Sequence, residues 1–338
     1  MTKANRRWIL AARPEGMVKE SDFKLETSPF PEPGDGEILV QSEYLSVDPY
    51  MRGRMNAGRS YADPVGIGEV MTCQGVGTVI RSKSDRFSEG DKVLGTIGWQ
   101  EFGIVQDAEA RRLTSSKAPV STALHVLGMP GLTAYFGLLN VIQAQSGQTI
   151  VISGAAGAVG STVGQIAKIK GCRAVGIAGS DAKTEWLSSE LGFDAAINYK
   201  TNPNLLQALK THCPEGVHGY FDNVGGTTTD AVFPLLAMKA RIGICGQISQ
   251  YNRNQIESGP RLLWQLIVKR ATIQGFLVFD FADQYREALS ALGGWVEDGS
   301  IKYKEHVVDG FEQMPNAFIG LFKGENVGKQ LVRIETTD

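Results

Sequence analysis

The sequence contains few of the residues that form disulfides or bind metal ions. Its 338 residues include four cysteines and four histidines. The cysteines form no close pair and the histidines are scattered, so the sequence suggests neither a disulfide framework nor a clustered zinc site. We expect reduced thiols and no bound metal. The cysteines are Cys73, Cys172, Cys213 and Cys245.

The sequence also lacks a long apolar run and an excess of positive charge. The apolar run near its start, Trp8–Ala12, is too short for the core of a signal peptide or for a membrane span. Its 34 Lys and Arg against 36 Asp and Glu give a formal net charge of -2, which offers no basic surface for nucleic acid. We therefore expect a cytoplasmic protein that binds a small molecule and has neither a nucleic-acid nor a membrane partner.

The length and the hydrophobic pattern predict an α/β protein with two domains. From Glu37 to about Leu113, short apolar runs broken by Gly and Pro indicate strands of an antiparallel, partly closed β domain. These runs are Ile38–Leu45, Gly75–Ile80, Lys92–Leu94 and Phe102–Val105.

Near Ser121 the pattern changes, and the expected helix Thr133–Val141 leads into a regular alternation of strands and helices. Such alternation is typical of a doubly wound parallel sheet. The expected strands are Thr149–Ser153, Arg173–Ala178, Ala195–Asn198, Tyr220–Val224, Arg241–Cys245 and Thr272–Leu277. The expected helices are Ser161–Lys170, Ala182–Leu191, Pro203–His212, Thr228–Ala237 and Tyr285–Glu297. Two later strands, Val307–Val308 and Gln330–Ile334, would return to the first domain.

A glycine-rich turn, Gly154–Gly160 (GAAGAVG), joins the strand Thr149–Ser153 to the next helix. Small residues at such a turn let the backbone and the helix N-terminus approach a pyrophosphate, whose charge the helix dipole favours. Ala155 stands where a glycine is usual, but the strand before the turn and the helix after it support a dinucleotide site.

The end of the strand Arg173–Ala178 distinguishes NADP from NAD, because an acidic residue there binds the ribose 2′-hydroxyl and repels a 2′-phosphate. Gly179 and Ser180 leave room and a hydroxyl, and Lys183 offers a cation. Alternatively, Asp181 is a helix cap and Lys183 a solvated helix residue. We favour NADPH/NADP, while Asp181 keeps NAD open.

Together with this turn, several distant motifs make the sequence resemble the medium-chain dehydrogenase/reductase superfamily. It is most similar to the zinc-free branch that holds prostaglandin reductases, plant alkenal double-bond reductases and bacterial NADPH-dependent curcumin reductase. The resemblance extends over nearly the whole chain. The motifs are Leu45–Gly53 (LSVDPYMRG), Gly90–Gly95 (GDKVLG), Gly128–Tyr135 (GMPGLTAY), Phe221–Gly226 (FDNVGG), Cys245–Asn252 (CGQISQYN) and Asn326–Lys329 (NVGK).

The resemblance implies a GroES-like catalytic domain from residues 1–125 and 305–338, and a Rossmann NADP-binding domain from residues 126–304, with the active site in the cleft between them. It also implies a homodimer formed through the edges of the Rossmann sheets. The implied cofactor-binding residues are Gly157, Ala158, Val159, Gly160, Ser180, Lys183, Tyr199, Asn223, Cys245, Gly246, Ile248, Ser249, Tyr251, Phe276, Leu277, Val278 and Asn326.

Without a metal to polarise a substrate oxygen, the chemistry expected is reduction of the carbon–carbon double bond of an α,β-unsaturated ketone or aldehyde, of the enone, 2-alkenal or curcumin type. Hydride adds to the β-carbon, hydrogen-bond donors stabilise the enolate, and a hydroxyl or water protonates the α-carbon. The resemblance makes Tyr251 the candidate catalytic donor, and Tyr50 and Tyr61 could line the substrate pocket. Two alternatives stay open, an NADPH:quinone reductase and a non-catalytic NADP-binding protein.

Overall fold

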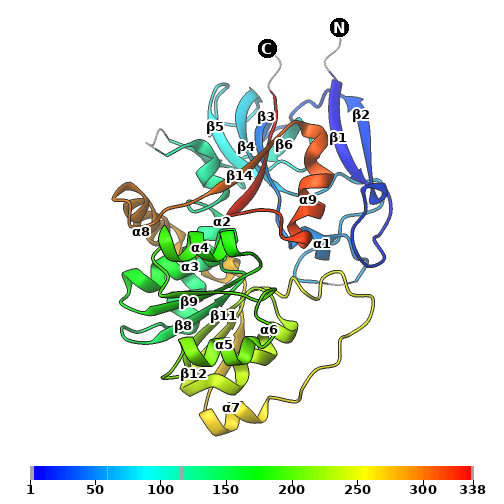
Figure 1. The fold of residues 1–338 in the computed structure, drawn as a ribbon. Helices are drawn as coiled ribbons and strands as arrows, with labels where there is room; N and C mark the ends of the chain where they lie inside the picture. Colours follow the sequence, from blue (N-terminus) through cyan, green and yellow to red (C-terminus); the bar gives the residue numbers. More distant parts are fainter. Residues whose placement is uncertain (1–3, 59, 115–117, 336–338) are drawn as a thin grey trace. The chain divides into compact units, whose positions relative to one another are not determined.

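The computed structural model describes residues 4–58, 60–114 and 118–335, which form two compact units (Figure 1). The first unit contains the chain up to Leu124 and again from Glu305 onward, and the second contains His125–Lys304. The expected α/β class is confirmed. No helix of the described segments has the length and apolar character needed to cross a membrane.

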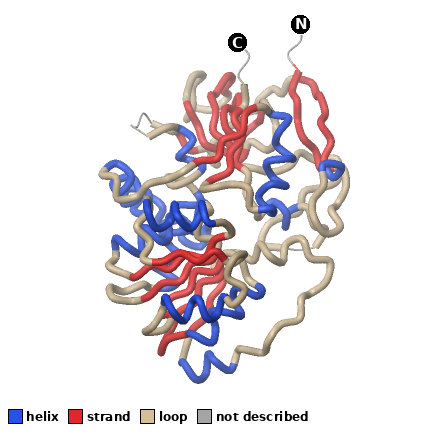
Figure 2. The backbone as a smooth tube through the Cα atoms, viewed as in Figure 1, coloured by secondary structure: helices blue, strands red, loops and turns tan. Residues whose placement is uncertain are grey.

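The first unit is built around a seven-stranded sheet with the order β14-β15-β3-β4-β5-β7, in which β6 also pairs with β3 (Figure 2). The central strand β3 pairs with β4 along one edge. Its other edge is shared by β6, at Glu37–Gln41, and β15, at Tyr44–Ser46, so β3 pairs with three other strands. The strands are β3 (Glu37–Ser46), β4 (Gln74–Ser82), β5 (Lys92–Thr96), β6 (Phe102–Gln106), β7 (Arg111–Arg112), β14 (Glu305–Asp309) and β15 (Lys329–Arg333).

Among the elements of this unit that were not predicted are the pair β1 (Ala4–Leu10) and β2 (Phe23–Pro29), and the helix α9 (Met314–Lys323). They complete one core, because the ring of Phe318 on α9 packs edge-on against both Phe23 and Trp99. The short helix α1 (Met51–Arg54) follows β3.

The second unit is a six-stranded parallel sheet with the order β10-β9-β8-β11-β12-β13. Numbered along the chain from β8, these strands have the Rossmann order 3-2-1-4-5-6. Strands β9 and β10 lie on one side of β8 and the later strands on its other side, so the strand order reverses between β8 and β11. In Figure 1, α3 and α4 lie on one face of the sheet and α5 and α6 on the other. The strands are β8 (Thr149–Ser153), β9 (Arg173–Ala178), β10 (Ala195–Asn198), β11 (Val217–Asp222), β12 (Leu236–Ile244) and β13 (Thr272–Gly275).

The helices of this unit differ in places from those expected. The helix predicted for Thr228–Ala237 ends at Val232, and β12 begins at Leu236, because Pro234 removes a backbone donor and its ring clashes with the preceding turn. The helix α7 was not predicted. The helices are α2 (Met129–Phe136), α3 (Ala158–Ile169), α4 (Asp181–Ser189), α5 (Leu205–His212), α6 (Gly226–Val232), α7 (Trp264–Lys269) and α8 (Tyr285–Glu297).

The helix expected at Thr133–Val141 is in fact α2 followed by a π-helical segment, Gly137–Ile142. At Gly137 an added Cβ would lie 2.5 Å from the rings of both Phe221 and Phe276. The absence of a side chain there lets this segment pack directly against aromatic rings beneath it.

Candidate functional site

The glycine-rich turn lies at the carboxyl end of β8, where the strand order reverses and α/β proteins bind ligands. Gly154 has a φ of +59°, and Gly157 is the N-cap of α3. A Cβ added to Gly160 would lie 2.4 Å from the Gly154 carbonyl oxygen, so only glycine lets the helix pack this closely on the turn. The first intrahelical bond runs from the Ser161 N–H to the Gly157 carbonyl. The N–H groups of residues 158–160 precede this bond, and the N-terminus of a helix favours an anion.

The adjacent strand end is organised by the buried carboxylate of Asp222, the last residue of β11. Its Oδ1 accepts hydrogen bonds from the hydroxyls of Ser153 and Tyr220, each at 2.9 Å, and from two backbone N–H groups of the following turn. Its Oδ2 accepts from the Thr229 hydroxyl at 2.6 Å. These bonds satisfy a carboxylate that would otherwise be costly to bury, and they fasten β8, β11 and α6 together.

Asn223, expected to contact the cofactor, is held in place by the same cluster. Its N–H donates to the Ser153 hydroxyl at 2.9 Å, and its Nδ2 donates to the Ser153 carbonyl at 2.7 Å. A Cβ on Gly154 would lie 3.4 Å from the Asn223 Cβ. Asn223 therefore stands directly beside the glycine-rich turn.

The segment after β12 runs alongside the same strand end. The N–H groups of Cys245 and Gly246 donate to the Asp222 carbonyl, and those of Ile248 and Ser249 donate to the next two carbonyls along. Within this segment the Tyr251 hydroxyl accepts the Gln247 N–H at 3.1 Å. The structure thus brings these residues together with the turn and with Asn223.

A second group of predicted residues lies at the ends of β9 and β10. Ser180 is the N-cap of α4, and its hydroxyl accepts the Lys183 N–H at 3.3 Å. Lys183 is half-buried, and its pKa is lowered by burial and by the nearby charge of Lys200. Tyr199 packs on the backbone, since a Cβ at Gly179 would lie 3.1 Å from its ring. This edge therefore holds two cations beside an exposed aromatic side chain.

Phe276, Leu277 and Val278 directly follow β13 at the far edge of the sheet. The Phe276 ring nevertheless reaches the centre of the sheet, where it stacks edge-on against Phe221 with centroids 6.0 Å apart. Val278 is buried in a cluster with Phe136 on α2, and the Leu277 N–H donates to Asp280.

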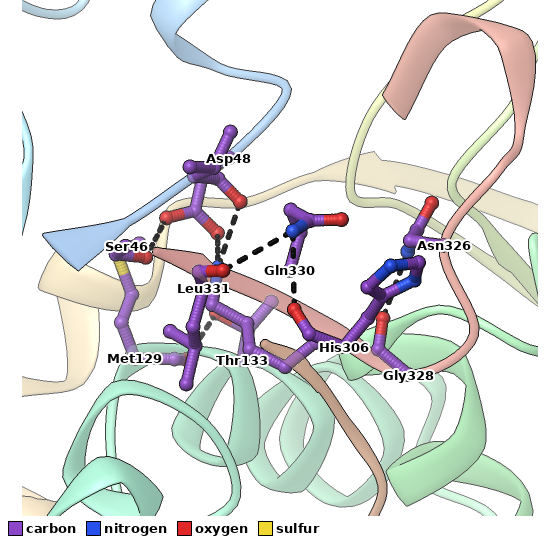
Figure 3. A network of polar contacts seen from close by, with 11 residues as sticks. Ser46, Asp48, Met129, Thr133, His306, Asn326, Gly328, Gln330 and Leu331 are labelled. Carbon is purple, nitrogen blue, oxygen red and sulfur yellow. Dashed lines mark hydrogen bonds and ion pairs between the residues drawn. The ribbon is translucent and has the colours of Figure 1, made fainter. Parts of the chain in front are cut away.

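The remaining predicted residues belong to the first unit. Tyr50 is the N-cap residue of α1 and packs against the core of that unit, and its pKa is raised well above the ordinary value by burial and by the charge of Asp48. Tyr61 is 54% exposed and lines a surface hollow of about 540 Å³, together with Ala57, Gly58 and other residues of Ser60–Pro64. The Asn326 amide donates to the Gly328 carbonyl at 2.8 Å (Figure 3). Because its pKa is raised, the Tyr50 hydroxyl stays protonated at neutral pH.

The four cysteines have raised pKa values. Burial raises the pKa of Cys213 to about 11, and burial with the Asp222 charge raises that of Cys245 to about 12. The pKa values of Cys73 and Cys172 are raised by burial as well. In the described ranges no three His, Cys, Asp or Glu side chains are grouped so that they could hold a metal ion.

Three residues of these sites were missed by reasoning from the sequence. Asp222 ends an apolar strand in the FDNVGG motif, where a charged residue after buried positions signals a structural role. Lys200 follows Tyr199 directly in the sequence, so it could have been expected at the same edge of the sheet. Asn198, at the end of β10, donates a hydrogen bond to Asp181 at the start of α4, and it carries no sequence signal because this contact depends on how β9 and β10 pair.

Two family models match the chain. One, described as the N-terminal domain of oxidoreductase, matches residues 6–113, and the other, described as zinc-binding dehydrogenase, matches residues 158–293.

Several curated proteins and solved structures are similar along almost their whole length. The chain is 49% identical over 336 residues to a putative NADP-dependent oxidoreductase of Bacillus subtilis, covering 99% of both chains. It is 42% identical to the NADPH-dependent curcumin reductase of Escherichia coli, covering 99% of this chain and 98% of the other. It is 41% identical to an NADP-dependent 2-alkenal reductase of Nicotiana tabacum, covering 98% of each. A crystal structure of CurA with NADPH from Vibrio vulnificus superposes with a TM-score of 0.93 at 45% identity, covering 98% and 100%.

Proposed function

The chain belongs to the NADPH-dependent branch of the medium-chain dehydrogenase/reductase superfamily that holds the curcumin and alkenal reductases, and from this we propose that it reduces the carbon–carbon double bond of α,β-unsaturated ketones and aldehydes with NADPH. The observation that carries the proposal is that the N-terminus of α3, which suits a pyrophosphate, occurs together with Lys183 and Lys200 at the neighbouring strand ends. End-to-end similarity to enzymes of this activity supports it.

The described residues fit NADPH. The N–H groups of residues 158–160 suit the pyrophosphate, because a helix N-terminus favours anions. Lys183 and Tyr199 suit the 2′-phosphate, and the Cys245–Tyr251 segment with Asn223 borders the same strand ends. We assign Phe276, Leu277, Val278 and Asn326 to the nicotinamide end. When bound, NADPH supplies the hydride.

The chain's own contribution to the chemistry is to provide hydrogen-bond donors for the substrate oxygen. As the β-carbon is reduced, negative charge collects on the carbonyl oxygen, and a fixed hydroxyl stabilises that charge. Tyr251 is our candidate for this donor, because its hydroxyl oxygen already accepts the Gln247 N–H and is thereby oriented. Tyr50 and Tyr61 are assigned to the substrate pocket, where the protonated Tyr50 phenol acts as a further donor.

The proposed reaction is tested by following NADPH absorbance with a panel of substrates and by identifying the products. The panel contains a medium-chain enone, a 2-alkenal, curcumin, a quinone and, with NADP, a secondary alcohol. Saturated ketone or aldehyde products support the proposal. Turnover of the quinone alone would make the chain a quinone reductase, and tight NADPH binding without any turnover would make it a non-catalytic binding protein. Metal analysis of the active protein should find no stoichiometric zinc.

We also propose that the protein is a homodimer that pairs through β13 and α7. β13 is an edge strand of the sheet, and all four of its residues are exposed. Such an edge presents unpaired backbone groups that a second copy can satisfy. Next to it α7 buries none of its residues, and Ile267 is 80% exposed. These features support a buried interface in the assembled protein.

The dimer is tested by sedimentation equilibrium. Ile267→Lys should shift the protein to monomers, whereas Ile67→Lys, at an exposed apolar position of the first unit, should not. A wild-type monomer at micromolar concentration would contradict the dimer. We place the protein in the cytoplasm, without nucleic-acid or membrane partners, because that compartment keeps thiols reduced and the chain has no excess of basic residues.

A further inference from the structure

An acidic residue stands where a coenzyme-selecting residue is expected. Asp181 is the first residue of α4 and closely follows β9, the position at which an acid favours NAD over NADP. In this chain the carboxylate has a partner, because the Asn198 Nδ2 donates to the Asp181 Oδ1 at 2.7 Å. Asn198 ends β10 and is only 6% exposed, whereas Asp181 is exposed. The surface carboxylate is therefore tied to a buried amide on the neighbouring strand.

The orientation of that amide is fixed from its other side. The Asn198 Oδ1 accepts the Lys200 N–H at 3.0 Å. A flipped amide would place its NH₂ against that N–H and its oxygen against the Asp181 carboxylate, which loses both bonds. Asn198 therefore presents a donor, and only a donor, to Asp181.

The turn around Asn198 is itself braced. Its backbone carbonyl accepts the Asn202 N–H at 3.1 Å and the Asn202 Nδ2 at 2.9 Å. One compact turn thus determines the position of the Lys200 backbone and the direction of the Asp181 carboxylate together. Lys183 lies within reach of the Lys200 charge, so the two cations and the restrained carboxylate share one edge of the sheet.

We propose that Asn198 is a positioning residue for coenzyme choice, which restrains the Asp181 carboxylate so that the two lysines, and not the acid, determine the response to the ribose 2′-substituent. This rests on the proposed function, in which the coenzyme lies along the ends of β8 and β9. A released carboxylate would accept a hydrogen bond from the 2′-hydroxyl of NADH and would repel the 2′-phosphate of NADPH. The Asn198–Asp181 bond removes this competition without replacing the acidic residue.

The test measures dissociation constants for NADPH and NADH by fluorescence titration, with no enone present. Asn198→Leu should lower the preference for NADPH over NADH about tenfold, the effect expected for loss of a hydrogen bond to a charged group. Asn198→Ala is a smaller replacement in case leucine disturbs the turn. The double variant Asn198→Leu with Asp181→Ala should recover most of the wild-type preference, because no carboxylate remains to be released.

The control is Asn202→Ala, which removes an amide from the same turn without touching Asp181. It should leave the preference unchanged. Two results would overturn the inference: a preference that does not fall in the Asn198 variants, or one that falls and is not recovered when Asp181 is also removed. The latter would mean that Asn198 acts only through the shape of the turn. Because these titrations contain no substrate, failure of the proposed double-bond reduction would not alter their result.

Discussion

Lys329 and Asp48 form a buried ion pair, with the Lys329 Nζ 2.7 Å from the Asp48 Oδ1. The same Nζ donates to the Val47 carbonyl at 2.8 Å, and Asp48 also accepts from the Ser46 hydroxyl. Figure 3 shows Asp48 beside Ser46. The pair joins the start of β15 to the segment that leaves β3, and these two segments carry Asn326 and Tyr50. The contact therefore positions two of the proposed site residues of the first unit.

Removing the lysine should be costly. Lys329→Met leaves the Asp48 carboxylate buried without its cation, which is expected to lower the free energy of unfolding by about 3–5 kcal/mol. Hydrogen exchange of peptides from β3 and β15 would measure this. Arg333→Met is the matched control on the same strand, since the Arg333–Asp309 pair is exposed and should contribute little. Equal exchange rates in the two variants would contradict the assignment.

Two glycines of the α3 turn should respond differently to alanine. Gly160→Ala places a Cβ 2.4 Å from the Gly154 carbonyl oxygen and 2.8 Å from the Ala155 Cα, so thermal unfolding should show a loss of about 1–3 kcal/mol. At Gly157 the nearest atom is 3.3 Å away, so the fold should be nearly preserved. Gly157→Ala should instead weaken NADPH binding by obstructing the pyrophosphate. Undiminished NADPH affinity in Gly157→Ala would argue against this turn as the site.

The affinity for NADPH should fall at alkaline pH. Burial and the Lys200 charge lower the pKa of Lys183, so its ammonium loses its proton at a lower pH than an ordinary lysine. A bound 2′-phosphate favours the charged form and raises that pKa, so binding should take up protons as the pH approaches the pKa of the free protein. Calorimetry in buffers of different ionisation enthalpy would detect this uptake. It should be absent with NADH and in Lys183→Met, and an identical uptake with NADH would contradict the role of Lys183.

Substitutions of Tyr251 and Tyr199 should have separate effects, one on the rate of the reaction and the other on NADPH binding. Tyr251→Phe should reduce kcat about 10- to 1000-fold, the range for loss of one donor to a developing oxyanion, with little change in the NADPH dissociation constant. The Gln247 N–H, which donates to the Tyr251 hydroxyl, is exposed, so in this variant it would donate to water instead at a low cost in free energy. Tyr199→Phe should show the reverse, with weaker NADPH binding and nearly unchanged kcat. Unchanged kcat in Tyr251→Phe would leave Tyr251 as a residue that only covers the coenzyme.

The elements that could be predicted are those whose burial matches their sequence pattern. β8, expected at Thr149–Ser153, is confirmed at those residues, because all of them are buried and the three central ones, Ile150–Ile152, form an apolar run. α7 was missed because apolar residues such as Ile267 are exposed within a single chain, so they form no stripe against a core. β1 was missed because its burial does not alternate, so the period of a half-buried strand is absent.

The candidate site could be predicted from the sequence where one local segment carries the expected chemistry, and not where distant residues meet. The turn Gly154–Gly160 could be predicted from its own residues and the flanking elements. The bond between Asn198 and Asp181 could not, because it depends on the parallel pairing of β9 and β10, which places Asn198 opposite Ala178. The hydrogen bonds to Asp222 likewise come from residues of β8 and α6, and no local sequence pattern shows that these elements lie close together.

The central claim, hydride addition to the β-carbon of an enone, is tested most directly by isotope transfer. The enzyme would be given NADPH with deuterium at the transferred C4 position and a simple enone in ordinary water, and the product examined by NMR and mass spectrometry. The account predicts a saturated ketone with one deuterium at the β-carbon and a hydrogen from solvent at the α-carbon. Deuterium on the former carbonyl carbon, in an allylic alcohol, or NADPH oxidation without deuterium in the product would contradict it.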